Sequence, residues 1–202
     1  VWYVLEAKPG AKIIYGLKPG VDRARLSAAI AENRIMECLE EVDVEAGDSF
    51  YIPAGTVHAL RAGVLVAEIQ QNSDTTYRLY DYDRPGLDGK PRELHIEDSL
   101  NVIAYEGSGA TRMKTGNVPP GEWLTLAVSP YFKVEKGVVA GQMRLRTTRD
   151  TFTVLVVCAG EGKLHWEDGA IDVRPGNCFL LPANLGECRL EGHLTVLRAY
   201  LP

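Results

Sequence analysis

The sequence predicts an all-β fold with two related barrels and a short helical insert. Many short apolar runs with strand-like alternation are separated by Gly, Pro, Asn and Asp, which is typical of barrels and sandwiches rather than of βαβ folds. One turn pattern occurs twice along the chain, which predicts two copies of one structural unit. The length of 202 residues and the hydrophobic content of 46% allow a packed core, so disorder is excluded as the main state.

In the first half of the chain, strand-like runs surround a stretch with helical spacing. Strands are expected at residues 2–5 and 12–15, and these two are expected to form a hairpin or meander. Asp22 can cap a helix, and apolar residues from about 21 to 42 recur at helical spacing, so a two-helix insert is expected that extends through Leu39 and Val42. The other strands of this half are expected at residues 49–52, 57–61, 65–71 and 77–82.

The second half is expected to consist of strands. Residues 84–92 contain several Pro and Gly and predict a loop or a crossing between domains. We therefore expect a first domain at residues 1–95 and a second at residues 99–202. Strands of the second domain are expected at residues 123–128, 131–134, 142–148, 153–158, 163–166, 178–181 and 194–200.

Charge and composition exclude several classes of function. The chain has 22 Lys and Arg against 27 Asp and Glu, and no block of like charge, so neither a general nucleic-acid binder nor a polybasic membrane binder is expected. No apolar stretch approaches the roughly 20 residues of a transmembrane helix, and the first residues do not resemble a signal peptide, so a cytoplasmic location is expected. The 4 cysteines form no CxxC pair, which excludes a zinc ribbon or a thioredoxin-type motif.

The repeated turn lies at residues 47–58 and 176–187. In both copies a Gly precedes a Pro by six positions. Gly55 of the first copy corresponds to Asn184 of the second, and Gly and Asn are the residues that best tolerate a left-handed backbone in a tight turn. The two copies therefore predict a shared strand–turn–strand unit.

The first copy of this turn resembles the second conserved motif of the cupin superfamily. That motif reads Gly-x5-Pro-x-Gly-x2-His, and cupins are double-stranded β-helix (jelly-roll) barrels that hold a metal on His and acidic ligands. The resemblance implies that His58 is a metal ligand. Its counterpart in the second copy is Glu187, so any metal is expected in the first barrel.

The run that follows His58, as far as Arg84, closely resembles the type I mannose-6-phosphate isomerases, in particular the short bacterial form. Residues 1–15 and 99–127 fit that family more loosely. The resemblance implies two cupin barrels, the first incomplete and carrying the metal and catalytic residues, the second structural. In these isomerases further zinc ligands precede the first strand, in a Gln-x-His motif and a Glu. The chain is accordingly expected to be a fragment that lacks the N-terminal part.

The activity that the resemblance implies is a zinc-dependent interconversion of mannose 6-phosphate and fructose 6-phosphate through an enediolate. His58 would bind the zinc, Arg78 would be the catalytic arginine of a Ser-Asp-x-x-x-Arg motif, and Asp74 would be the acid of that motif, placed to bind substrate. Arg84 falls where longer members have a phosphate-binding Lys. A metal and a fixed guanidinium suit this chemistry because both stabilise a developing oxyanion.

Each of these residues also has a plainer interpretation. Arg78 could pair with Asp74 or Asp81, Asp74 could be a turn or capping residue, and Arg84 could be a surface charge. Glu68 could point into the pocket or outward. The remaining histidines are expected to be structural or on the surface: His95, His165 and His193.

One imidazole does not hold zinc tightly, because catalytic zinc sites generally use three protein ligands. This chain alone is therefore expected to lack the intact site, and Leu60 stands where longer members have a Tyr. A second hypothesis is a non-catalytic cupin module that binds sugar phosphates, or a regulator, and has lost its metal. A different cupin metalloenzyme would need a His-x-His motif, which the sequence does not contain. The physiological hexose phosphate, the metal, the general base and the oligomeric state stay open.

Overall fold

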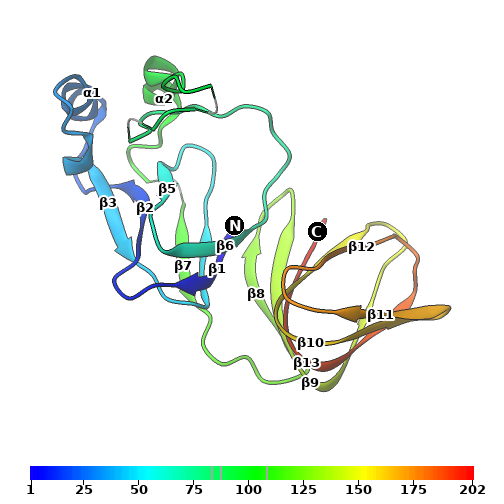
Figure 1. Ribbon diagram of the computed structural model, residues 1–202. Coiled ribbons are helices and arrows are strands. Elements are labelled where there is room, and N and C mark those ends of the chain that lie inside the picture. The colour runs from blue at the N-terminus through cyan, green and yellow to red at the C-terminus, as the bar shows by residue number, and fades with distance from the viewer. Residues whose placement is uncertain (83, 87, 108) are drawn as a thin grey trace.

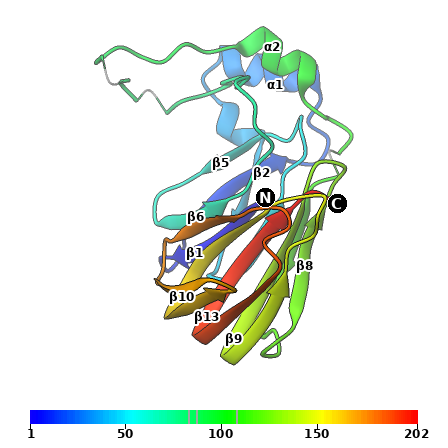
Figure 2. The same ribbon diagram turned by 90° about the vertical axis from the view of Figure 1, so that its right-hand side faces the viewer.

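The computed structural model describes residues 1–82, 84–86, 88–107 and 109–202. The chain forms two β-rich halves, and the two α-helices lie side by side at the end of the first half that is remote from the second (Figures 1 and 2). No helix among the described residues is long and apolar enough to cross a membrane. The elements of the first half are β1 (Trp2–Ala7), β2 (Lys12–Leu17), α1 (Arg23–Ala31), η1 (Ile35–Glu37), β3 (Leu39–Asp43), β4 (Asp48–Tyr51), β5 (His58–Leu60), β6 (Val64–Glu68), α2 (Ile96–Val102) and β7 (Thr111–Lys114).

Two sheets face each other in the first half. One has the order β6-β1-β4-β7 and the other the order β3-β2-β5. The predicted hairpin of the first two strands is wrong, because β1 pairs with β4 and β6 whereas β2 pairs with β3 and β5. The turn at Pro9 and Gly10 instead carries the chain from one sheet to the other, and Trp2, Ile13 and Phe50 fill the space between them.

The helical insert is shorter than expected. Asp22 does cap α1, since its carboxylate accepts the backbone N–H of Arg25 at 2.8 Å. The second predicted helix is reduced to the 3-10 turn η1, and Leu39 and Val42 lie on β3, paired with β2. A short apolar run fits a helix or a strand by periodicity alone, and here pairing with a neighbouring strand decides the outcome.

Residues 77–82 form no strand in the described part of the chain, contrary to expectation. Leu79 packs instead against a core under the helices that includes Leu26 and Leu100. The expected loop at 84–92 is confirmed for its described residues, and Leu87 lies outside them; a Pro85–Pro91 bridge closes it. Helix α2 and strand β7 were not expected from the sequence.

The second half, as described, consists of strands and their connections: β8 (Trp123–Val128), β9 (Lys133–Arg146), β10 (Thr153–Trp166), β11 (Gly169–Val173), β12 (Cys178–Leu181) and β13 (Glu187–Tyr200). The sheet order is β11-β10-β13-β9-β8, with β12 also paired to β10. Four predicted strands are therefore parts of two long ones, β9 and β10. The all-β class is confirmed, although the sheets do not close into complete barrels.

Glycine allows the long strands to approach closely. A Cβ atom at Gly160 would lie 1.8 Å from the carbonyl oxygen of His193 on β13. The two halves meet through β1, where Val1 and Tyr3 pack against Val134 and Leu197 of the second half.

Candidate functional site

His58 lies at the start of β5, directly after the first copy of the repeated turn. Its Nδ1 atom is 2.7 Å from the carbonyl oxygen of Thr56. A carbonyl only accepts, so Nδ1 carries the proton of the neutral ring and Nε2 keeps its lone pair. The side chain is exposed, and its ring packs edge-to-face on Trp2 at 5.3 Å between centroids. The hydrogen bond from Nδ1 to a backbone carbonyl is how proteins commonly orient an imidazole that binds a metal through its other nitrogen.

Glu68 is an acidic neighbour of the same tryptophan. The indole N–H of Trp2 donates to Oε1 of Glu68 at 3.0 Å, and the two residues are paired between β1 and β6. Trp2 therefore contacts both His58 and Glu68. In the described parts of the chain, however, no three His, Cys, Asp or Glu side chains are grouped to hold a metal ion. These residues supply one oriented imidazole but do not by themselves fit a zinc ion.

Arg78 is held in place by His95. The backbone N–H of Arg78 donates to Nδ1 of His95 at 3.2 Å, and the backbone N–H of His95 donates to the carbonyl of Arg78 at 2.8 Å. The guanidinium Nη1 also donates to the carbonyl of Glu93 at 3.1 Å. His95 thus has a structural role, and no pattern in the sequence indicated that its partner is Arg78.

Helix α2 connects the segment of Arg78 to the turn before His58. His95 precedes the first residue of the helix. At the other end, the backbone N–H of Ala104 donates to the carbonyl of Gly55 at 3.0 Å. One helix therefore supports both sequence segments that carry the predicted catalytic and metal-binding residues.

Arg84 is tied to Asp81. Its Nη2 lies 3.0 Å from Oδ1 of Asp81, and Arg92 binds both oxygens of the same carboxylate, with Nε at 2.6 Å from Oδ2. The hydrogen bond from Arg92, supported by Arg84, lowers the pKa of the buried Asp81 to about 2. Asp81 therefore pairs with these two arginines, not with Arg78.

Asp74 is exposed, and its carboxylate lies 3.5 Å from the hydroxyl of Thr75. Across the described residues, no hydrogen bond or ion pair joins any two of the four predicted site residues His58, Asp74, Arg78 and Arg84. Sequence reasoning missed that Asp81 pairs with both Arg84 and Arg92. Asp81 and Arg92 are eleven positions apart in an irregular segment, where no periodic pattern indicates a contact.

Residues 122–201 match a family model described as the cupin domain of mannose-6-phosphate isomerase. The mannose-6-phosphate isomerase ManA of Bacillus subtilis is 38% identical over 99% of this chain, and the mannose-6-phosphate isomerase of Streptococcus mutans is 34% identical over 98%. The chain is related to the mannose-6-phosphate isomerases. The crystal structure of the Bacillus subtilis mannose 6-phosphate isomerase superposes with a TM-score of 0.80 and 31% identity, covering 98% of this chain.

This chain spans 63% and 62% of the length of those two curated mannose-6-phosphate isomerases and 63% of the solved chain. A mannosephosphate isomerase structure from Archaeoglobus fulgidus, described as putative, has 21% identity and a TM-score of 0.73; it covers 99% of this chain and 59% of its own, and it supports the fold alone. The resemblance drawn from the sequence is thus confirmed.

Proposed function

We propose that this chain carries the catalytic face of an aldose–ketose isomerase that interconverts mannose 6-phosphate and fructose 6-phosphate. The observation that carries the proposal is the relationship, over nearly the whole chain, to proteins named for that reaction. The oriented imidazole of His58 and the anchored Arg78 agree with it, because they are the residues that the family motif marks.

In this proposal the substrate is bound by its charges. Isomerisation moves a proton from carbon 2 to carbon 1 through an enediolate, in which negative charge develops on the sugar oxygens. Arg78 would stabilise that charge, since a guanidinium keeps its proton at neutral pH and presents several N–H donors. Arg84 would bind the phosphate, and Asp74 would hydrogen-bond the sugar. Arg84 would have to exchange part of its contact with Asp81 for the phosphate, while Arg92 still neutralises that carboxylate.

Zinc would be bound through Nε2 of His58 together with further ligands, because the described residues group no three His, Cys, Asp or Glu side chains around one ion. The ion, when bound, would supply Lewis acidity to the sugar oxygens. Thr56 and Trp2 would fix the imidazole for this role, the first through the proton on Nδ1 and the second through ring packing.

The competing proposal is a module that binds sugar phosphates without catalysis. The single oriented imidazole favours it, because a set of three ligands is not formed by the described residues. The two proposals differ in metal content and turnover.

The test compares this chain with a form extended upstream through a Gln-x-His motif and a Glu. Bound zinc is measured by elemental analysis, and turnover is measured by coupling fructose 6-phosphate formation to a dye. Zinc near one per chain and turnover in the extended form would support the isomerase. An extended form that binds zinc but converts no hexose phosphate would leave the binding module as the better account.

Arg78→Ala in the active form is expected to lower kcat by about 100-fold or more, by analogy with the loss of one oxyanion donor. Arg25→Ala is the matched control, because Arg25 is an exposed arginine on α1 whose backbone, not its side chain, contacts Asp22. Equal activity of the two variants would contradict the role given to Arg78.

A further inference from the structure

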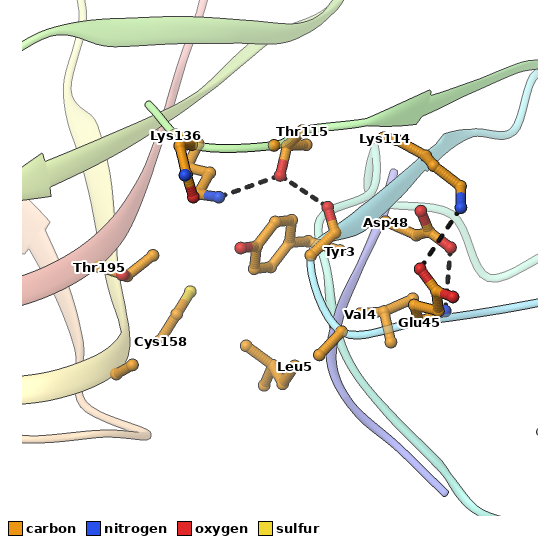
Figure 3. A pocket seen from close by; sticks show the side chains of 15 residues that line it. Tyr3, Val4, Leu5, Glu45, Asp48, Lys114, Thr115, Lys136, Cys158 and Thr195 are labelled. Atoms are coloured by element: carbon orange, nitrogen blue, oxygen red, sulfur yellow. Dashed lines mark hydrogen bonds and ion pairs between the residues drawn. The ribbon is translucent and has the colours of Figure 1, made fainter. Parts of the chain in front are cut away.

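A cavity of about 470 Å³ lies between the two halves of the molecule (Figure 3). One wall comes from β1, from residues 45–48 and from the segment after β7, and the other comes from β9, β10 and β13. The four predicted site residues do not line it. Its volume is in the range of sites for small organic ligands.

Lys136 gives this cavity its charge. The side chain is buried, at 7% exposed, and its ammonium donates to Oγ1 of Thr115 at 3.0 Å and lies 5.5 Å from the centre of the Tyr3 ring. No carboxylate of a described residue forms an ion pair with it. Burial without a compensating charge lowers the pKa of Lys136. An ammonium has three N–H donors, so two remain after the bond to Thr115.

The acidic residues around the cavity are already neutralised. Glu45 pairs with Lys114 at 3.3 Å, and Asp48 pairs with Arg112 at 2.7 Å. Burial raises the pKa of Cys158 to about 12, so this thiol is uncharged at neutral pH. Lys136 is therefore the lining charge that still lacks a counter-ion in the part of the chain that the structure describes.

Two backbone donors belong to residues that line the same cavity. Gly116 and Asn117 line the cavity, and within the described ranges neither backbone N–H has a hydrogen-bond partner. Gly116 has a φ of +51°, in the left-handed region. Successive backbone N–H groups next to a residue in the left-handed region form concave sites that bind anions.

We propose that this inter-domain cavity binds a small phosphate-bearing anion, held by the ammonium of Lys136 and the backbone N–H groups of Gly116 and Asn117. A phosphate has enough acceptor oxygens for the two free ammonium protons and both backbone donors. The ligand would also contact both halves of the molecule, and would therefore stabilise their packing. This site is separate from the proposed catalytic face, where Arg84 would bind the substrate's phosphate.

The first test is calorimetric titration of the chain with inorganic phosphate in a low-salt buffer without other multivalent anions. Lys136→Met is expected to weaken binding by about tenfold or more, because it removes charged donors from a buried site. Lys114→Met is the matched control, since this lining lysine is exposed and already paired. Lys114→Met is expected to bind within about twofold of the parent chain. Arg84→Gln is titrated as a comparison variant, because it removes the group proposed to bind the substrate's phosphate and so separates that site from the cavity.

A second measurement uses the unchanged chain, so it does not depend on any variant folding. Lysines are acetylated with a trace of acetic anhydride, and the rate at Lys136 and Lys114 is measured by mass spectrometry with and without phosphate. Phosphate is expected to slow the reaction of Lys136 selectively. The titration is then repeated with a hexose phosphate, and with the neutral hexose to show whether the sugar alone binds. Tighter binding of the hexose phosphate than of inorganic phosphate would identify an ester as the ligand, and tighter binding of inorganic phosphate would identify the free ion.

Three outcomes would overturn the proposal: no binding of either phosphate compound, equal binding to Lys136→Met, or unchanged acetylation of Lys136 at saturating phosphate. Binding that is lost in Arg84→Gln and kept in Lys136→Met would support the proposed catalytic face and reject the cavity. Binding that is lost in Lys136→Met alone would support the cavity, whatever the outcome for isomerase activity.

Discussion

Gly55 is the residue through which the turn before His58 contacts the end of α2. Its φ is +84°, and a Cβ atom there would lie 2.8 Å from the carbonyl oxygen of Val102 and 3.3 Å from the backbone nitrogen of Ala104. Both neighbouring atoms belong to the backbone, so neither can rotate away as a side chain could. Gly55→Ala is therefore expected to strain the turn and to push α2 outward.

The expected destabilisation has two parts. A left-handed backbone costs alanine about 1 kcal/mol or slightly more. Displacement of α2 weakens the hydrogen bond from Ala104 to Gly55, which adds about 1 kcal/mol. The sum is about 2 to 3 kcal/mol. Gly20→Ala is the matched control: its φ is +74°, but no atom lies within 4 Å of the added Cβ, so only the backbone part applies.

Urea denaturation followed by tryptophan fluorescence measures both free energies of unfolding. Hydrogen exchange on the amides of α2 shows whether the loss is local. Gly55→Ala is expected to unfold at lower urea than Gly20→Ala and to speed exchange in α2. If the two variants lose the same free energy, the contact between Gly55 and α2 does not support the turn, and the reasoning is refuted.

Three further variants test other parts of the structure. Gly160→Ala is expected to cost about 3 kcal/mol or more in urea denaturation, because the added Cβ would lie 1.8 Å from a backbone oxygen of β13 and the strands must separate. Leu26→Ala removes a fully buried side chain from the core under the helices and is expected to cost about 2 to 5 kcal/mol by the same assay; a loss below about 1 kcal/mol would contradict that packing. Asp81→Asn is expected to lower the melting temperature at pH 7. Because Arg92 lowers the pKa of Asp81 from 3.8 to about 2, the carboxylate's contribution is complete above pH 4 and is lost as the pH falls through 2, so the difference between the parent chain and the variant is expected to shrink over that interval.

The repeated turn is the element that the sequence predicted most completely. Gly55 and Asn184 both have positive φ, at 84° and 63°, as their correspondence required. Both turns connect a short strand to the next one, β4 to β5 and β12 to β13. The prediction succeeded because a left-handed backbone restricts residue type locally, whatever the surroundings are.

Predictions that depended on distant contacts failed more often. Leu39 and Val42 fit a helix by spacing, but pairing with β2 makes them a strand. Residues 77–82 alternate like a strand, yet Leu79 lies in the core under the helices. In both cases the local pattern allowed two structures, and packing with residues far along the chain selected one.

The same dependence on distant contacts governs the candidate site. The family motif marks His58 and Arg78 but says nothing of what fixes the distance between them. In the structure that distance is set by α2, which bonds to Arg78 through His95 at one end and to Gly55 at the other. Val57 and Ala59, on either side of His58, pack in the same core as Leu79, which directly follows Arg78 in the chain. The helices α1 and α2 therefore support both segments. Substitutions in the core that these helices share are expected to disturb the site before they disturb the sheets.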